Sequence, residues 1–250
     1  MKNLGLIGYP ISHSGSPELF KEIFSDNKKI LDEYSYSLLE YEELSQAAKL
    51  FYDHYIAVNV TAPFKEEALA LADNYSTDVQ IIGATNLLVK DDDSVVTAYN
   101  TDYLALRQMI PEGRRVLVLG CGGAGKGAAV AALDNGCSLF LYNRTPHKLT
   151  TFSNHLKNFS SLHSERLTVL YSLEELPKIL EQVDIVVNTL SERVDLFDKS
   201  LLKGKLVIEA NYKDPLYSDE ELSAVQAEYL SGEHWLRLQA LHTYRIIGLL

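Results

Sequence analysis

Four short polar clusters stand out in the first 102 residues of the chain. They hold Ser14 and Ser16, then Asn59, Thr61 and Lys65, then Asn86, and last Asp102. Together they offer hydroxyls, amides, one ammonium and one carboxylate, which are groups that can bind a small polyhydroxylated acid by hydrogen bonds. Each residue also has a structural alternative: Ser16 before Pro17 is a good helix N-cap, and Lys65 can be a solvated surface lysine.

A glycine-rich segment follows an apolar strand predicted at residues 115–119. Gly120, Gly122 and Gly125 have the spacing G-x-G-x-x-G, with Gly123 and Ala124 between the last two. In such loops the first glycine allows a tight turn, the second lets the backbone approach a pyrophosphate, and the third lets the helix pack closely on the strand. A purely steric glycine turn is the alternative, but the position between a strand and a helix favours dinucleotide binding.

The residues after the next predicted strand, 137–142, indicate which dinucleotide binds. They are Asn143, Arg144 and Thr145, with Lys148 close behind. NAD-specific sites usually place an acid near this point to bind the ribose 2′-hydroxyl. Here the acid is missing, and Arg144 can instead form paired hydrogen bonds with a 2′-phosphate while Lys148 adds positive charge. The sequence therefore predicts NADP rather than NAD, although Arg144 could also be a solvated surface charge.

Strand-like and helix-like segments alternate along the chain, which predicts an α/β fold. The first half has expected strands at 4–8, 34–39, 55–60, 84–89 and 94–98 and helices at 16–24, 41–52 and 65–74. The second half has expected strands at 115–119, 137–142, 184–188 and 206–210 and helices at 128–133 and 219–230. We expect an N-terminal α/β substrate domain with a mainly parallel sheet and a Rossmann-like NADP-binding domain.

The domain boundaries follow from the restart of the α/β pattern at residue 115. We expect residues 102–233 to form the NADP-binding domain. Residues 235–250 are helical in pattern and half apolar, so they can fold back on the first domain. Residues 1–101 and 234–250 would then form the substrate-binding and catalytic domain.

Composition limits the classes of partner and of site. The formal net charge is -11, which argues against nucleic acid and anionic membrane surfaces as partners. No apolar run approaches the ~18 residues of a membrane span, and the apolar stretch at 4–9 is too short for a signal peptide, so a cytoplasmic location is expected. The two cysteines, Cys121 and Cys137, lack a metal-binding spacing, and no metal site is expected. The sequence does not define an oligomeric state.

Taken together, these motifs resemble those of the shikimate dehydrogenase family over almost the whole chain. H-S-x-S-P, N-V-T-x-P-x-K, G-A-x-N and N-T-D occur in the family's order, followed by G-x-G-G-A and N-R-T. The resemblance implies a two-domain enzyme with an NADP site in the second domain. Its reaction would be the reversible NADPH-dependent reduction of 3-dehydroshikimate to shikimate, a step of chorismate and aromatic amino acid biosynthesis.

The resemblance also implies roles for individual residues. Substrate-binding positions would be Ser14, Ser16, Asn59, Thr61, Lys65, Asn86 and Asp102, joined by Tyr212 and Gln239 from the second half of the chain. Lys65 would act as general acid and base, with Asp102 as its orienting partner.

The chain departs from the family pattern at several points. Leu87 stands where the family usually has threonine, Leu190 interrupts a run of small residues, and His234-Trp235 replaces the usual Gly-Met. The tail after Gly248 is short. A quinate dehydrogenase and a catalytically silent NADP-binding sensor are the alternative functions. The presence of both Lys65 and Asp102 disfavours the sensor.

Overall fold

The chain folds into two compact units, each with its own six-stranded sheet. The computed structural model describes residues 1–190, 192 and 194–250. Unit 1 comprises Met1–Thr101 and Ala240–Leu250, and unit 2 comprises Asp102–Gln239. The second division falls inside the last helix, α11 (Gly232–Ile246), a few residues beyond the position expected from the sequence.

Unit 1 is built on a mixed sheet with the strand order β2-β1-β3-β5-β6-β4. Its strands are β1 (Lys2–Gly8), β2 (Tyr34–Glu40), β3 (Tyr55–Val60), β4 (Asn74–Tyr75), β5 (Leu87–Lys90) and β6 (Val96–Tyr99). Strand β1 pairs in parallel with β2 and β3, and β4 pairs in parallel with β6. Strand β5 runs antiparallel to both of its neighbours. Parallel pairings therefore predominate, and β3 brings residues 59–65 to the same sheet edge as the end of β1.

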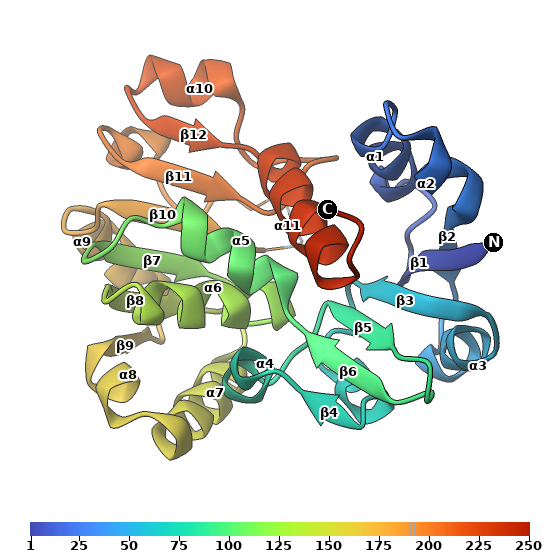
Figure 1. The fold of residues 1–250 in the computed structure, drawn as a ribbon. Coiled ribbons are helices and arrows are strands. Elements are labelled where there is room, and N and C mark those ends of the chain that lie inside the picture. The colour runs from blue at the N-terminus through green and yellow to red at the C-terminus, as the bar shows by residue number, and fades with distance from the viewer. Residues whose placement is uncertain (191, 193) are drawn as a thin grey trace. The chain divides into compact units, whose positions relative to one another are not determined.

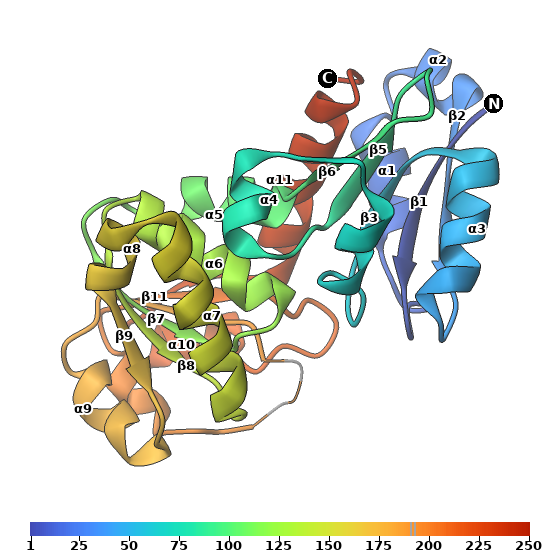
Figure 2. The same cartoon turned by 90° about the horizontal axis from the view of Figure 1, so that it is seen from below.

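Apolar side chains on both faces of this sheet form the core of unit 1. Its helices are α1 (Ser16–Ile23), α2 (Lys28–Glu33), α3 (Leu44–His54), the 3₁₀ helix η1 (Glu67–Leu71) and α4 (Thr77–Ile82). Val58 faces Phe51 of α3, whereas Ala57 faces the cluster of Phe20 and Tyr244. Figure 2 shows α3 and α1 on opposite sides of β1. Because Tyr244 lies on α11, the C-terminal segment completes the core of the N-terminal unit, with ring centroids 5.8 Å apart for Tyr244 and Phe20.

The helix expected at residues 65–74 is absent. A turn over residues 62–66 leads into η1, and β4 follows. The Lys65 carbonyl, which a helix would use internally, accepts a hydrogen bond from the Thr85 N–H at 2.8 Å. The Asp73 N–H donates to the Val96 carbonyl at 2.8 Å, so the end of the segment 65–74 pairs with β6 and joins the sheet. Hydrogen bonds to residues distant in sequence thus outweigh the local helix preference.

Unit 2 is an open sheet in which all strands are parallel, in the order β12-β11-β10-β7-β8-β9. The strands are β7 (Arg115–Leu119), β8 (Ser138–Tyr142), β9 (Leu167–Leu170), β10 (Ile185–Asn188), β11 (Leu206–Glu209) and β12 (Glu228–Leu230). Numbered within the unit, the order is 6-5-4-1-2-3, the arrangement of doubly wound dinucleotide-binding folds. The strand order reverses between β7 and β10, and folds of this class bind their ligands at that point, beyond the carboxyl ends of the strands.

Helices cover this second sheet. They are α5 (Thr101–Met109), α6 (Gly123–Asp134), α7 (Pro146–Phe159), α8 (Ser161–Arg166), α9 (Leu176–Leu180), α10 (Asp219–Ala224) and the first part of α11, with 3₁₀ turns η2 (Leu173–Glu175) and η3 (Lys199–Leu202). Helix α6 runs along β7 and β8 (Figure 1). Within residues 1–190, 192 and 194–250, no helix is long and apolar enough to cross a membrane.

The helix expected at 219–230 is shorter in the structure. Helix α10 ends at Ala224, and Gln226 adopts a φ of 60° that no helix accommodates. Residues 228–230 then form β12, which pairs in parallel with β11. The edge of β11 offers backbone N–H and carbonyl groups that β12 pairs with and that a longer helix would leave unpaired. This pairing explains why the helix is shorter than expected.

Candidate active site

The glycine loop after β7 has a separate structural reason for each of its glycines. Gly120 has a φ of +109°, and a Cβ there would lie 2.4 Å from Thr189 Oγ1. A Cβ on Gly125 would lie 2.1 Å from the Gly120 carbonyl oxygen, so this glycine lets α6 pack on the loop. At Gly122, apart from its chain neighbours, no atom of residues 1–190, 192 and 194–250 lies within 4 Å of a Cβ. The open space over Gly122 is what a pyrophosphate needs for close approach to the backbone, so the loop fits a dinucleotide.

Asn143 ties this loop to the end of the next strand. Its Oδ1 accepts from the Cys121 N–H at 3.0 Å, and its Nδ2 donates to the Thr145 carbonyl at 3.1 Å. Gly123 and Ala124 begin α6, with Gly122 as the N-cap, so the first N–H groups of this helix have no side-chain cap. Asn143 therefore supports the shape of the glycine loop.

Arg144 and Lys148 present exposed cations beside this loop. The Arg144 side chain is 73% exposed and forms an ion pair with Glu192, which is 58% exposed. Lys148 lies in the first turn of α7, where its N–H donates to the Thr145 carbonyl at 3.2 Å. Glu192 was not anticipated from the sequence, since no motif marks it. A 2′-phosphate at Arg144 would compete with this carboxylate, and an exposed pair of this kind is weak enough to yield.

A buried polar network in unit 1 joins two of the predicted substrate residues. Asn59 donates from Nδ2 to Thr243 Oγ1 at 3.0 Å and accepts from the Tyr36 hydroxyl at 3.0 Å. The Asn86 Oδ1 accepts from the Thr101 N–H at 2.6 Å, at the start of α5. The hydroxyls of Thr101 and Thr243 lie 3.4 Å apart and close the network. Asn59 and Asn86 thus hold the ends of β3, β5 and β6 together.

Thr243 and Tyr36 are the members of this network that sequence reasoning missed. Thr243 is only 3% exposed, although it lies on α11, far along the chain from its partners. The available signal was weak: a hydroxyl residue placed among the apolar positions of the last helix. Its contact with Asn59 joins residues 184 positions apart in sequence.

Thr61 and Lys65 lie at the carboxyl end of β3. The Thr61 N–H donates to the Ile7 carbonyl and its carbonyl accepts from the Phe64 N–H, which fixes the turn before Lys65. Gly8 packs against Thr61, because a Cβ on Gly8 would lie 2.4 Å from Thr61 Cγ2. The Lys65 side chain is half-buried.

Ser14 and Ser16 lie in the loop that leads from β1 into α1. The Ser14 hydroxyl donates to the Ser16 hydroxyl at 3.2 Å, and both side chains are half-buried. The N-cap of α1 is Gly15, which makes no side-chain cap hydrogen bond, and the Ser14 hydroxyl accepts from the Ser16 N–H at 3.3 Å. The N-cap alternative for Ser16 is therefore wrong, because Ser16 is already the first residue of the helix.

Asp102 is the second residue of α5 and the first of unit 2. It is 7% exposed, and its Oδ1 accepts a hydrogen bond from the Trp235 indole at 3.0 Å. The negative charge in the first turn of the helix is favoured by the helix dipole. Thr101, the preceding residue, belongs to the network of unit 1.

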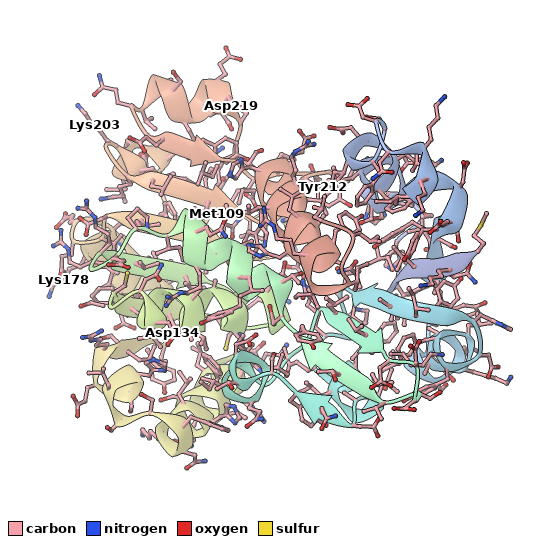
Figure 3. The ribbon with its side chains drawn as sticks, viewed as in Figure 1. Met109, Asp134, Lys178, Lys203, Tyr212 and Asp219 are labelled. Atoms are coloured by element: carbon pink, nitrogen blue, oxygen red, sulfur yellow. The ribbon has the colours of Figure 1, made fainter. Side chains whose placement is uncertain are left out.

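Tyr212 lies on the loop after β11, next to the start of α11 (Figure 3). The anchor of this loop is Glu209, a fully buried carboxylate that sequence reasoning missed. It accepts from Asn188 Nδ2 at 3.1 Å, from the Asn211 N–H at 3.1 Å and from the Leu216 N–H at 3.2 Å. Burial raises the pKa of Glu209 above its ordinary value, against the opposing effect of these hydrogen bonds.

Gln239 and two of the departures from the family pattern, Leu87 and Leu190, have defined surroundings in the structure. Gln239 donates from Nε2 to the Leu236 carbonyl at 3.0 Å within α11. Leu87 is fully buried in an apolar cluster at the start of β5, where it packs with Tyr244 and Leu4. The Leu190 carbonyl accepts from Asn211 Nδ2 at 2.7 Å, which links the loops after β10 and β11.

Comparison with known proteins agrees with this architecture. Residues 6–88 match the profile of the shikimate dehydrogenase substrate binding domain. A shikimate dehydrogenase (NADP(+)) of Shewanella woodyi is 31% identical over 89% of this chain and 84% of its own length. The crystal structure of shikimate dehydrogenase from Aquifex aeolicus has 28% identity and a TM-score of 0.82, covering 98% of this chain and 92% of its own. Shikimate 5-dehydrogenase from Thermus thermophilus in complex with shikimate has 25% identity and a TM-score of 0.81, covering 100% and 93%. The chain therefore belongs to the shikimate dehydrogenase family.

Proposed function

We propose that this chain catalyses the reversible NADPH-dependent reduction of 3-dehydroshikimate to shikimate, a step of chorismate and aromatic amino acid biosynthesis. Because folds of this class host many activities, the proposal depends on the site residues more than on the fold. The observation that carries it is the joint presence of Lys65, Asp102 and the open glycine loop over Gly122 in a member of this family.

The proposal assigns NADP binding to unit 2 and most of substrate binding to unit 1, with Asp102, Tyr212 and Gln239 contributed by unit 2. Hydroxyls of Ser14 and Ser16, with that of Tyr212, hold the substrate carboxylate. Amides and hydroxyls of the remaining substrate-binding residues hold the ring hydroxyls: Asn59, Thr61, Asn86 and Gln239. The glycine loop, Asn143, Arg144, Thr145 and Lys148 would hold NADP, and the first N–H groups of α6 would bind its pyrophosphate.

Lys65 and Asp102 carry the proton chemistry. NADPH, when bound, supplies the hydride that reduces the ketone. The Lys65 ammonium gives a proton to the oxygen that becomes the new hydroxyl, and in the reverse direction the neutral amine accepts it. Asp102 accepts a hydrogen bond from the same substrate hydroxyl and orients it toward the lysine.

The direct test is a steady-state assay of the purified chain with shikimate and with quinate, each with NADP and with NAD. We expect the highest kcat/KM for shikimate with NADP. Quinate carries an additional hydroxyl on the carbon that bears the carboxylate, so a preference for quinate would indicate a quinate dehydrogenase. NADP binding with no turnover of either acid would indicate a silent sensor.

Arg144→Ala is expected to raise the KM for NADP about tenfold and to leave the KM for NAD almost unchanged. A charge-assisted hydrogen bond contributes about 1.5–3 kcal/mol, and the exposure of Arg144 and its pairing with Glu192 place the effect at the lower end. Arg114→Ala, which removes another exposed arginine of the same unit, is the control. Equal losses with both cofactors would contradict the assignment of Arg144 to the 2′-phosphate.

Gly122→Ala is expected to weaken NADP binding, whereas Gly125→Ala is expected to lower the stability of the fold. Alanine fits the extended backbone at Gly122 and meets no atom, so the melting temperature should hold while the KM for NADP rises. Alanine at Gly125 would place its Cβ 2.1 Å from a backbone oxygen, and the strain should cost about 1–3 kcal/mol of stability. Thermal unfolding without cofactor, compared with NADP titration, separates the two effects. A loss of stability in Gly122→Ala would argue against an open phosphate site.

Ser14→Ala and Ser16→Ala are expected to raise the KM for shikimate several-fold with a small change in kcat. Each variant removes one neutral hydrogen bond of about 0.5–1.5 kcal/mol. Ser16 does not cap α1, so Ser16→Ala should change the melting temperature little, whereas Ser14→Ala also removes the acceptor of the Ser16 N–H. Kinetics and thermal unfolding of both variants check this expectation. Unchanged kinetics with lower melting temperatures would assign the serines a structural role only.

A further inference from the structure

Trp235 makes a contact that the usual family residue cannot make. The chain has one tryptophan, and it stands where the family pattern usually has methionine. Its side chain is 3% exposed, and the indole Nε1–H donates to Asp102 Oδ1 at 3.0 Å. Methionine offers no hydrogen-bond donor at this position.

We propose that Trp235 is a positioning residue for the reaction: its indole N–H holds the carboxylate of Asp102 in the orientation that binds the substrate hydroxyl. This inference rests on the function proposed above, because it gives Asp102 that role. It adds a residue that the family motifs do not include.

The fold fixes the position of the indole tightly. A Cβ on Gly232 would lie 2.4 Å from the Asn211 carbonyl carbon and 2.6 Å from the Tyr212 nitrogen, so only glycine lets the first turn of α11 lie against this loop. The Trp235 N–H donates to the Ser231 carbonyl at 3.2 Å within that turn. The indole therefore projects from a helix start whose place is set by backbone contact.

The two groups satisfy each other chemically. A buried indole has one N–H and no acceptor, and leaving that donor unpaired is unfavourable. A carboxylate at 7% exposure also requires donors, and a hydrogen bond to a charged group is stronger than one between neutral groups. Because the indole neither gains nor loses a proton in the working pH range, it is a permanent donor. It restricts rotation of the carboxylate without competing for the proton that Lys65 transfers.

The presence of a single tryptophan allows an atomic test. Global replacement of tryptophan by β-(3-benzothienyl)alanine exchanges the indole N–H for sulfur at Trp235 alone. We expect kcat for shikimate oxidation with NADP to fall about tenfold, with a smaller rise in the KM for shikimate and no change in the KM for NADP. Trp235→Phe should reproduce the kinetic loss. Wild-type kcat in the benzothienyl protein would overturn the inference.

A second readout does not depend on activity. The ¹⁵N-labelled protein has one indole N–H resonance. Asp102→Asn replaces the charged acceptor by a neutral amide, so this proton should shift to higher field and exchange faster with solvent. Glu233→Gln, at an exposed acid two positions before Trp235, is the matched control and should leave the resonance in place. An indole resonance unmoved by Asp102→Asn would also overturn the inference, whereas absence of turnover in the wild-type protein would overturn the proposed function.

Discussion

Replacement of Lys65 by alanine is expected to lower the turnover number for shikimate oxidation by about 10²–10⁴-fold, the usual effect of losing a general acid–base group. The KM for shikimate should change much less, because the hydroxyls and amides of the other substrate residues remain. The backbone contact of Lys65, in which its carbonyl accepts from the Thr85 N–H, is retained in alanine. Thermal unfolding of the variant separates a loss of turnover from a loss of stability.

Steady-state kinetics at saturating NADP and shikimate measure this effect. Lys49→Ala, which removes an exposed lysine of α3 that pairs with Asp53, is the matched control and should keep full turnover. Asp102→Asn should lose both rate and affinity, because that carboxylate is assigned to the substrate as well as to the proton transfer. Near wild-type turnover in Lys65→Ala would refute the proton-transfer role and leave the cofactor assignment intact.

Glu209→Ala is expected to lower the free energy of unfolding by about 1–3 kcal/mol or more, the penalty for leaving buried hydrogen-bond donors unpaired. The carboxylate is fully buried, and its loss would leave the N–H groups of Asn211 and Leu216 and the Asn188 amide without their acceptor. Since Asn211 precedes Tyr212, the KM for shikimate should also rise. Urea unfolding measures the stability, and Glu220→Ala, an exposed glutamate of α10, is the control.

The raised pKa of Glu209 also predicts how stability depends on pH. Burial makes the folded protein bind this proton more tightly than the unfolded chain does. The contribution of Glu209 to stability is therefore largest below the ordinary carboxyl value of 4.5 and falls as the pH rises through the higher folded-state value. Glu209→Gln does not titrate and should lack this component. An identical pH dependence of unfolding in Glu209→Gln and the wild-type protein would contradict the assignment.

Local sequence determined the parts of the fold whose signals are short and contiguous. Strands β3 and β7 were predicted with the bounds that the structure has, because each is an apolar run with β-branched residues that ends at a turn. The loop from Gly120 to Gly125 was likewise predictable, since its glycine spacing fixes a strand-turn-helix geometry within a few residues. The parallel sheet of unit 2 follows from the alternation of strands and helices.

Tertiary structure decided the features that depend on partners far along the chain. Segments 65–74 and 219–230 both have helical composition. In the structure, however, the end of each segment forms part of a strand, which pairs with β6 in the first case and with β11 in the second. The contacts between Asn59 and Thr243, and between Trp235 and Asp102, join residues 184 and 133 positions apart. Periodicity reports which face of an element is apolar, but it does not report which buried donor meets which acceptor. For this protein the sequence therefore determined the family and predicted the residues of the site, and the packing of distant elements decided which buried donors meet which acceptors.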